Sequence, residues 1–255
     1  RDLHLSLRRQ RQMCIRDRLT GPFAHCGIRW GLTGTVPKAD YEFMGLKCSI
    51  GDVTHRIQAS ELQDKGVLAN CHVNVLQTQD HPQFKTYAEE LKWLTTDTTR
   101  MTWVAKTIQD IATSGNTLIL VDRISAGEIL EKKIKDSVFV SGSTKNMDRK
   151  EQYDEISTAT NKIIIATYGV ASVGINIPRI FNLVLIEPGK SFVRVIQSIG
   201  RGIRKAEDKD SVQIWDITSS CKFAKRHLGA RKKFYKEANY PYNIEKIDYE
   251  NPYTR

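Results

Sequence analysis

The sequence predicts an α/β fold in which a parallel sheet is covered by helices on both faces. From residue 116 onward, short apolar runs alternate with stretches of helical spacing, which is the pattern of repeated βαβ units. The runs are continuously apolar, as strands buried on both faces require. The chain has 255 residues and 40% hydrophobic content, enough for one large domain or one and a half smaller ones.

Five apolar runs are predicted to be strands: residues 117–121, 137–140, 162–166, 181–186 and 212–217. Helices are expected from the first strand to about Lys135, from the second to about Ser157, and over Ser191 to about Ile203. Functional groups in such folds lie beyond the carboxyl ends of the strands, so the segments that follow these runs are the first candidates for a site.

Upstream of residue 116 the patterns are shorter. A helix is expected over 60–66, with Ser60 as its N-cap and Gly66 as its C-terminal stop. Residues 71–77 alternate and predict an edge strand, and the spacing from Pro82 to Thr113 is helical. Two apolar stripes mark this helical stretch: Tyr87, Leu91 and Leu94, then Trp103, Val104, Ile108 and Ile111. We expect Trp93 and Trp103 to belong to the core.

The net charge of +10 and pI near 9.4 favour a polyanionic partner such as nucleic acid, although a basic protein with no such partner is also compatible with them. No run of about eighteen apolar residues occurs, so no membrane span is expected. The five scattered cysteines indicate free thiols in a reducing compartment, with neither a zinc site nor a disulfide framework. A cytoplasmic protein without a metal site of its own is the expectation.

A candidate phosphate-binding motif lies in Val195–Lys205. Gln197, Arg201 and Arg204 are spaced i, i+4 and i+7, so they project from one helix face, with Gly200 between them. Arginine keeps its charge and its planar fork matches phosphate oxygens. The alternative is a solvated basic helix end.

Three further segments follow predicted strands. The loop Thr167–Pro178 contains glycines and hydroxyls that can face a phosphate, although ordinary crossovers have the same composition. Ser141-Gly-Ser-Thr144 begins a predicted helix, where exposed amides could bind phosphate or be capped by Ser143 or Thr144. Arg123 could contact a nucleic-acid backbone or pair with Asp122.

The last helix is basic, and its cations could form a solvated face or contact a DNA backbone. These cations are Lys222, Lys225, Arg226, Arg231, Lys232, Lys233 and Lys236. Phe223, Ala230, Phe234 and Ala238 are predicted to form its apolar stripe.

In order and spacing, these motifs resemble those of superfamily-2 helicases of the DExH type. Gln197-x-x-Gly-Arg-x-x-Arg204 is similar to motif VI, Thr167–Pro178 to motif V, Asp122-Arg123 to motif IV and Gly31-Leu-Thr-Gly-Thr35 to motif III. The likeness is greatest to UvsW-like phage recombination DNA helicases. It extends through Tyr87-x-x-Glu90, Ser141-Gly-Ser, Tyr168-Gly-Val, Ile199-Gly-Arg and Trp215-Asp-Ile.

The resemblance implies a RecA-like helicase C-terminal lobe over 81–220, preceded by the tail of a first RecA-like lobe with motif III and a connector over 19–80. Residues 221–255 would form a basic C-terminal helix and tail. Residues 1–18, dense in arginine, are expected to be non-native or disordered.

The resemblance also implies roles for individual residues. Arg201 and Arg204 would be arginine fingers, and Gln197 would orient them or touch the nucleotide. Gly174, Asn176 and Gly200 would lie near the nucleotide, although many relatives carry Asp at the position of Asn176. The nucleic-acid contacts would be Arg123, Ser141, Gly142, Ser143 and Thr167, and the coupling residues of motif III would be Thr33, Gly34 and Thr35.

The implied cofactor is ATP with Mg²⁺, and the implied substrate is branched DNA or a single-strand/duplex junction in a phage-infected or bacterial cell. Neither G-x-x-x-x-G-K-[ST] nor D-E-x-H occurs in the sequence, so the Mg²⁺ ligands are expected on an N-terminal RecA-like lobe. The chain by itself is therefore predicted to be inactive, as the C-terminal part of a longer helicase. The alternatives are an RNA helicase, a restriction-type double-strand translocase, and a nucleic-acid-binding RecA-like module without ATPase activity.

Overall fold

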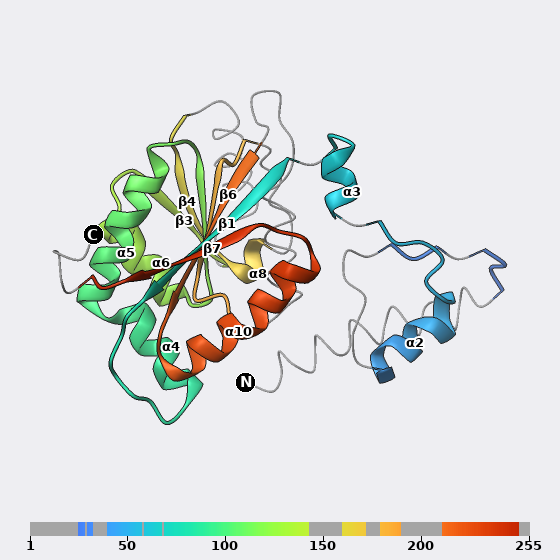
Figure 1. Ribbon diagram of the computed structural model, residues 1–255, viewed down its shortest axis with the longest axis horizontal. Helices are drawn as coiled ribbons and strands as arrows, with labels where there is room; N and C mark the ends of the chain where they lie inside the picture. Colours follow the sequence, from blue (N-terminus) through green and yellow to red (C-terminus); the bar gives the residue numbers. More distant parts are fainter. Residues whose placement is uncertain are drawn as a thin grey trace. The chain divides into compact units, whose positions relative to one another are not determined.

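The computed structural model describes residues 25–28, 30–32, 40–57, 59–67, 69–142, 160–171, 179–189 and 211–249. The chain divides into two compact units, Arg1–Ile57 and Gln58–Arg255. The first contains helix α2 (Asp40–Ile50). The second contains the sheet and its helices (Figure 1).

A seven-stranded sheet forms the centre of the second unit, in the order β3-β4-β2-β5-β6-β1-β7. Every neighbouring pair is parallel. The strands are β1 (Asn70–Thr78), β2 (Thr117–Val121), β3 (Ser137–Val140), β4 (Ile163–Thr167), β5 (Asn182–Ile186), β6 (Ser211–Ser219) and β7 (Tyr242–Ile247).

Helices cover both faces of this sheet. The helices of this unit are α3 (Ala59–Asp64), α4 (Tyr87–Thr96), α5 (Thr98–Ala112), α6 (Ile124–Lys133), α8 (Tyr168–Ala171) and α10 (Lys222–Glu237). Figure 1 shows α5 and α6 on one side of the strands and α8 and α10 on the other. Side chains alternate along β2, so Ile119 belongs to the core cluster of Ile108 on α5, and Leu118 to that of Leu228 on α10. This two-sided burial confirms the predicted fold class.

All five strands predicted after residue 116 are present, with ends that differ by at most two residues. The strand predicted at 71–77 is also present, but its assignment as an edge strand is wrong, because β7 pairs with it. Strand β7 was not predicted. It is largely solvent-exposed and carries Asn243, Glu245 and Lys246, so it lacks the apolar run that revealed the other strands.

The helical stretch predicted over 82–113 is two helices. Asp97 separates them: it ends α4, and its side chain accepts a hydrogen bond from the Arg100 amide at the start of α5 (2.9 Å). Helix α3 begins at Ala59 and is followed by Gly66 in the left-handed region (φ 66°), the predicted stop.

The compact second unit is larger than the lobe predicted over 81–220, because β1, α10 and β7 belong to it. No helix in the described part of the chain is long and apolar enough to cross a membrane.

Candidate nucleic-acid interface

Three segments predicted to bind nucleic acid meet at the carboxyl edge of the sheet. Thr167, the last residue of β4, is in register with Val121, the last residue of β2. On its other side β4 pairs with β3, with Val140 opposite Ala166. Arg123 and Ser141, which follow β2 and β3, therefore lie at the same edge as Thr167. The structure thus brings these three residues together, as the parallel register requires.

The side chains at this edge differ in their hydrogen bonds and in their exposure to solvent. Thr167 Oγ1 accepts a bond from the Val170 amide (3.5 Å) within the first turn of α8. Ser141 is 7% exposed, whereas Gly142 is exposed and has open space at its Cα. Arg123 Nη2 donates to the carbonyl oxygen of Ala88 on α4 (3.3 Å), a contact that neither sequence interpretation included.

The remaining predicted site residues lie outside the described residues. They are Gln197, Gly200, Arg201 and Arg204 of motif VI, Gly174 and Asn176 of motif V, Ser143, and Thr33, Gly34 and Thr35 of motif III. Their assignment rests on the sequence.

A buried network of charges occupies the same sheet edge beyond β5, β6 and β1. Glu187 directly follows β5 and has a positive φ of 43°. It accepts hydrogen bonds from Arg100 of α5 (2.7 Å) and from Thr218 Oγ1 of β6 (3.2 Å). Burial raises the pKa of Glu187 to about 7, although the Arg100 and Arg231 guanidiniums lower it.

Asp80, just beyond β1, belongs to the same network. Its carboxylate accepts from Thr78 Oγ1 (2.6 Å) and from the Tyr249 hydroxyl (2.7 Å). Arg100 Nε lies 3.5 Å from the Asp80 carboxylate, and the Arg100 side chain is fully buried. A single arginine therefore connects the ends of β1 and β5.

A second buried arginine, Arg231 of α10, binds Asp216 of β6 through two hydrogen bonds (2.8 and 2.9 Å). Tyr235 donates to the same carboxylate (2.9 Å), and Arg231 Nη1 donates to the carbonyl oxygen of Gly189 (2.8 Å). Although burial lowers the pKa of Arg231, the neighbouring Asp216 carboxylate helps to hold it above its ordinary value. Arg231 is 3% exposed, so both suggestions for it, a solvated face and a DNA contact, were wrong.

The predicted apolar stripe of this helix is confirmed only in part, since Phe234 is buried in the core and Ala238 packs against it. Ala230 is exposed, and Phe223 and Ala238 are only partly buried. The buried residues are Ala224, His227, Leu228, Arg231, Phe234 and Tyr235. Their spacing is helical, but a histidine and an arginine interrupt the apolar pattern.

Helix α10 receives its N-terminal cap from another helix. The Glu90 carboxylate of α4 accepts bonds from the backbone amides of Phe223 (3.0 Å) and Ala224 (2.7 Å), whereas the N-cap residue Cys221 makes no side-chain capping bond. An anion at this helix end is favoured by the unpaired amides and the helix dipole. Glu90 is only 1% exposed and so joins α4 firmly to α10.

Sequence reasoning did not identify Arg100, Glu187, Asp216 or Arg231 as structurally important. A signal was available for one of them, because Asp216 interrupts a strand predicted to be buried, and buried carboxylates require partners. The partners themselves are distant in sequence.

The carboxylates of this edge do not offer a Mg²⁺ site. Asp80, Glu187 and Asp216 each contact an arginine. Among the described residues, no group of three or more histidine, cysteine, aspartate or glutamate side chains is arranged to hold a metal ion.

Comparison with known proteins adds independent information. Residues 99–206 match the family described as the helicase conserved C-terminal domain. The ATP-dependent DNA helicase uvsW of Enterobacteria phage T4 is 27% identical over 221 residues, which are 82% of this chain and 44% of the phage protein. The chain thus spans less than half the length of this relative.

Solved structures agree on the fold. The crystal structure of T4 UvsW matches with a TM-score of 0.61 and 23% identity, over 71% of this chain and 42% of the other. A fragment of a putative HsdR subunit of a type I restriction enzyme from Vibrio vulnificus matches with a TM-score of 0.67 and 18% identity, over 86% of this chain and 44% of that one.

Proposed function

Because this chain carries the C-terminal RecA-like lobe of a superfamily-2 helicase, we propose that it works in an ATP-dependent DNA helicase or translocase that remodels or unwinds branched DNA. The observation that carries the proposal is the meeting of Arg123, Ser141 and Thr167 at one sheet edge. The net charge of +10 favours a polyanion as the partner, and the phage relative is named a DNA helicase.

In this proposal the carboxyl edge holds the backbone of one DNA strand. The backbone at Gly142 is exposed and can approach a phosphate closely, since no side chain intervenes. Ser141 is buried and would support this loop, with Ser143 contributing its amide. Arg123 would add a cation, and Thr167 would contact the strand while capping α8.

The nucleotide would be bound between this lobe and an N-terminal RecA-like lobe, which would supply the Mg²⁺ ligands. Arg201 and Arg204 would stabilise charge on the γ-phosphate as arginine fingers, with Gln197 orienting them. Gly174, Asn176 and Gly200 would lie against the nucleotide. When bound, ATP with Mg²⁺ supplies the free energy for strand movement.

We further propose that the unit before Gln58 includes the tail of that first lobe. Thr33, Gly34 and Thr35 would couple nucleotide binding to the DNA-binding face. The segment proposed for this role is 19–80, of which residues up to 57 belong to the first compact unit.

Fluorescence anisotropy with a labelled DNA fork and the matching RNA fork tests the proposal. We expect the chain to bind the DNA fork more tightly, and Arg123→Ala to weaken binding and lower the salt slope by about one. Lys236→Ala, at the far end of α10, is the control and should leave binding unchanged. Tighter binding of RNA would exclude a DNA enzyme, and unchanged binding by Arg123→Ala would exclude the proposed contact edge.

A further inference from the structure

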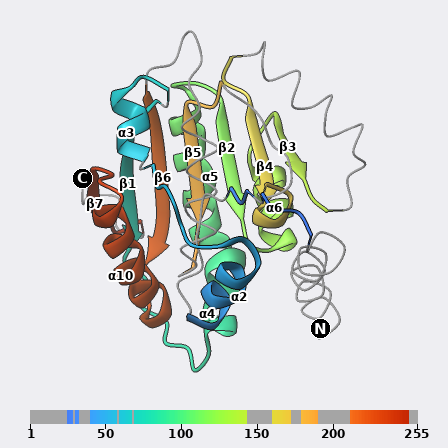
Figure 2. The ribbon, with the colours of Figure 1, turned by 90° about the vertical axis from the view of Figure 1, so that its right-hand side faces the viewer.

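A pair of partly exposed aromatic rings lies beside the proposed DNA-binding edge. Tyr87 opens α4 and Phe223 lies in the first turn of α10, with ring centroids 6.3 Å apart. Tyr87 is 36% exposed and Phe223 is partly exposed. Both helices begin at the carboxyl edge, since α4 follows β1 and α10 follows β6. Figure 2 shows α4 and the start of α10 near each other at the lower end of the strands.

Two cations lie over the Phe223 ring of this pair. Lys222 Nζ lies 5.5 Å and Arg226 Cζ 5.2 Å from the centre of the Phe223 ring. Lys222, Lys225 and Arg226 are all exposed. The nearby acidic residue Glu90 is buried and used as a cap. Glu89 is exposed, and its carboxylate accepts a hydrogen bond from the backbone amide of Thr86, the N-cap residue of α4 (3.4 Å).

Contacts between α4 and α10 hold the two rings in place. The Tyr87 ring packs edge-on against His227, with centroids 4.7 Å apart. Glu90 is three residues beyond Tyr87, so both project from the same side of α4. While Tyr87 contacts Phe223 and His227, Glu90 binds the α10 amides. The rings are therefore fixed before any ligand arrives.

Arg123 connects this pair to the proposed DNA-binding edge. It donates to the carbonyl of Ala88 (3.3 Å), the residue next to Tyr87. Arg123 is thus linked through the backbone next to Tyr87 to Phe223 at the start of α10. Positive charge beside exposed rings suits single-stranded nucleic acid, whose phosphates need cations and whose bases stack on aromatic faces.

We propose that Tyr87 and Phe223 form a base-stacking site for single-stranded DNA, which extends the backbone contacts at Arg123 and Thr167. This inference rests on the proposed function, because the strand would reach the rings from that edge. It assigns the first turns of α4 and α10 to the DNA-binding surface. Lys222 and Arg226 would contact phosphates on either side of a stacked base.

The test measures binding of a fluorescein-labelled oligothymidylate to the whole chain. Tyr87→Leu and Phe223→Leu keep an apolar side chain but remove the aromatic face, and we expect each to weaken binding about tenfold. The loss should persist at high salt, because stacking releases few ions, whereas Lys222→Ala should mainly lower the salt slope.

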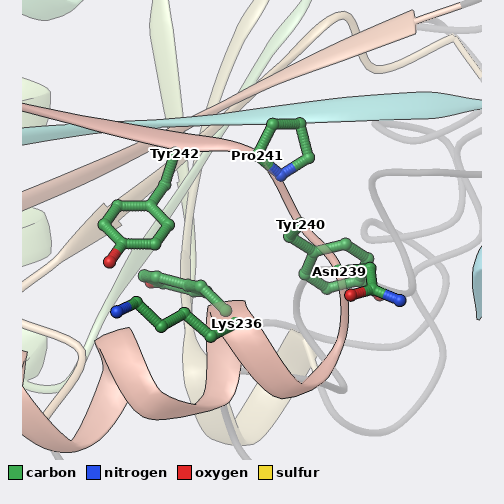
Figure 3. A pocket seen from close by; sticks show the side chains of 6 residues that line it. Lys236, Asn239, Tyr240, Pro241 and Tyr242 are labelled. Atoms are coloured by element: carbon green, nitrogen blue, oxygen red, sulfur yellow. The ribbon is translucent and has the colours of Figure 1, made fainter.

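A matched control lies at the other end of α10. There Lys236 and Tyr242 line an open depression with Tyr240 and Pro241, again a lysine beside aromatic rings (Figure 3). Phe223 and Lys236 are thirteen positions apart on α10, which corresponds to about 20 Å along the helix. Tyr242→Leu should bind DNA like the unmodified chain. An equal loss in this variant would overturn the proposed position.

A second measurement does not depend on how the variants fold. Ultraviolet crosslinking of 5-iododeoxyuridine oligonucleotides to the unmodified chain should attach the base to Tyr87 or Phe223, as read by mass spectrometry of peptides. If Arg123→Ala weakens binding but the leucine variants bind normally and crosslinks fall elsewhere, the stacking site is refuted and the proposed function stands. Failure to bind any DNA would refute both, and equal affinity for oligouridylate would refute the choice of DNA.

Discussion

Arg231 and Asp216 form a two-point ion pair inside the lobe, with N–O distances of 2.8 and 2.9 Å. The pair joins α10 to β6, and the remaining nitrogen of Arg231 binds the carbonyl of Gly189. Gly189 follows β5 and directly precedes the sequence segment that contains motif VI. On the other face of the sheet, Arg100 of α5 binds Glu187 in the same turn. This turn is therefore fixed by two arginines that come from opposite faces.

Replacing Arg231 should be strongly destabilising. Arg231→Ala leaves the fully buried Asp216 carboxylate without its cation, which typically costs about 3–5 kcal/mol. Urea denaturation followed by circular dichroism measures the free energy of unfolding. Lys233→Ala, an exposed cation on the same helix, should change it by less than about 0.5 kcal/mol. Equal effects of the two substitutions would contradict a structural role for the ion pair.

Sequence patterns predicted the sheet well because burial on two faces leaves continuous apolar runs, as in Thr117–Val121 and Asn182–Ile186. Strand β7 was not predicted, because an exposed edge strand needs no continuous apolar run. Arg231 was misassigned because a buried arginine and an exposed one look alike in sequence. What distinguishes it is Asp216, whose proximity depends on the packing of α10 against β6.

The residues of the candidate site also differ in whether the sequence alone reveals them. The shared position of Arg123, Ser141 and Thr167 at one sheet edge could be predicted, because motif order and strand ends are both visible in the sequence. The aromatic pair of Tyr87 and Phe223 could not, since it requires two helix starts separated by more than a hundred residues to meet. The physical cause of that meeting is Glu90, whose carboxylate binds the amides of α10.

Glu187 should make stability depend on pH. Its folded pKa of about 7 exceeds the usual 4.5, so between these values the folded chain keeps a proton that the unfolded chain has lost. The resulting stabilisation is complete below about pH 4.5 and disappears as pH rises through about 7. As pH rises from 4.5 to 7, the free energy of unfolding of the unmodified chain, measured in urea, should therefore fall relative to the free energy of unfolding of Glu187→Gln. A constant difference between the two proteins across pH 4.5 to 7 would exclude the raised pKa.

Removing the cap of α10 should loosen its first turn. Glu90→Ala leaves two backbone amides unpaired in a buried position, which we expect to destabilise the chain by about 1–3 kcal/mol. Hydrogen exchange read by mass spectrometry should show faster exchange at the start of α10. Glu128→Ala, an exposed residue of α6, should leave that exchange unchanged. Protection equal to that of the unmodified chain in Glu90→Ala would show that the cap contributes nothing.

The arginine fingers are tested in a chain that is joined to a nucleotide-binding first lobe. There, Arg204→Ala should abolish ATP hydrolysis while DNA affinity stays unchanged, because a finger stabilises charge that develops only during phosphoryl transfer. Loss of such a residue lowers the rate by roughly a thousandfold or more. Phosphate release and fork binding are measured on the same preparation, with Lys236→Ala as the control that retains both. Hydrolysis at the unmodified rate in Arg204→Ala would remove this residue from the active site.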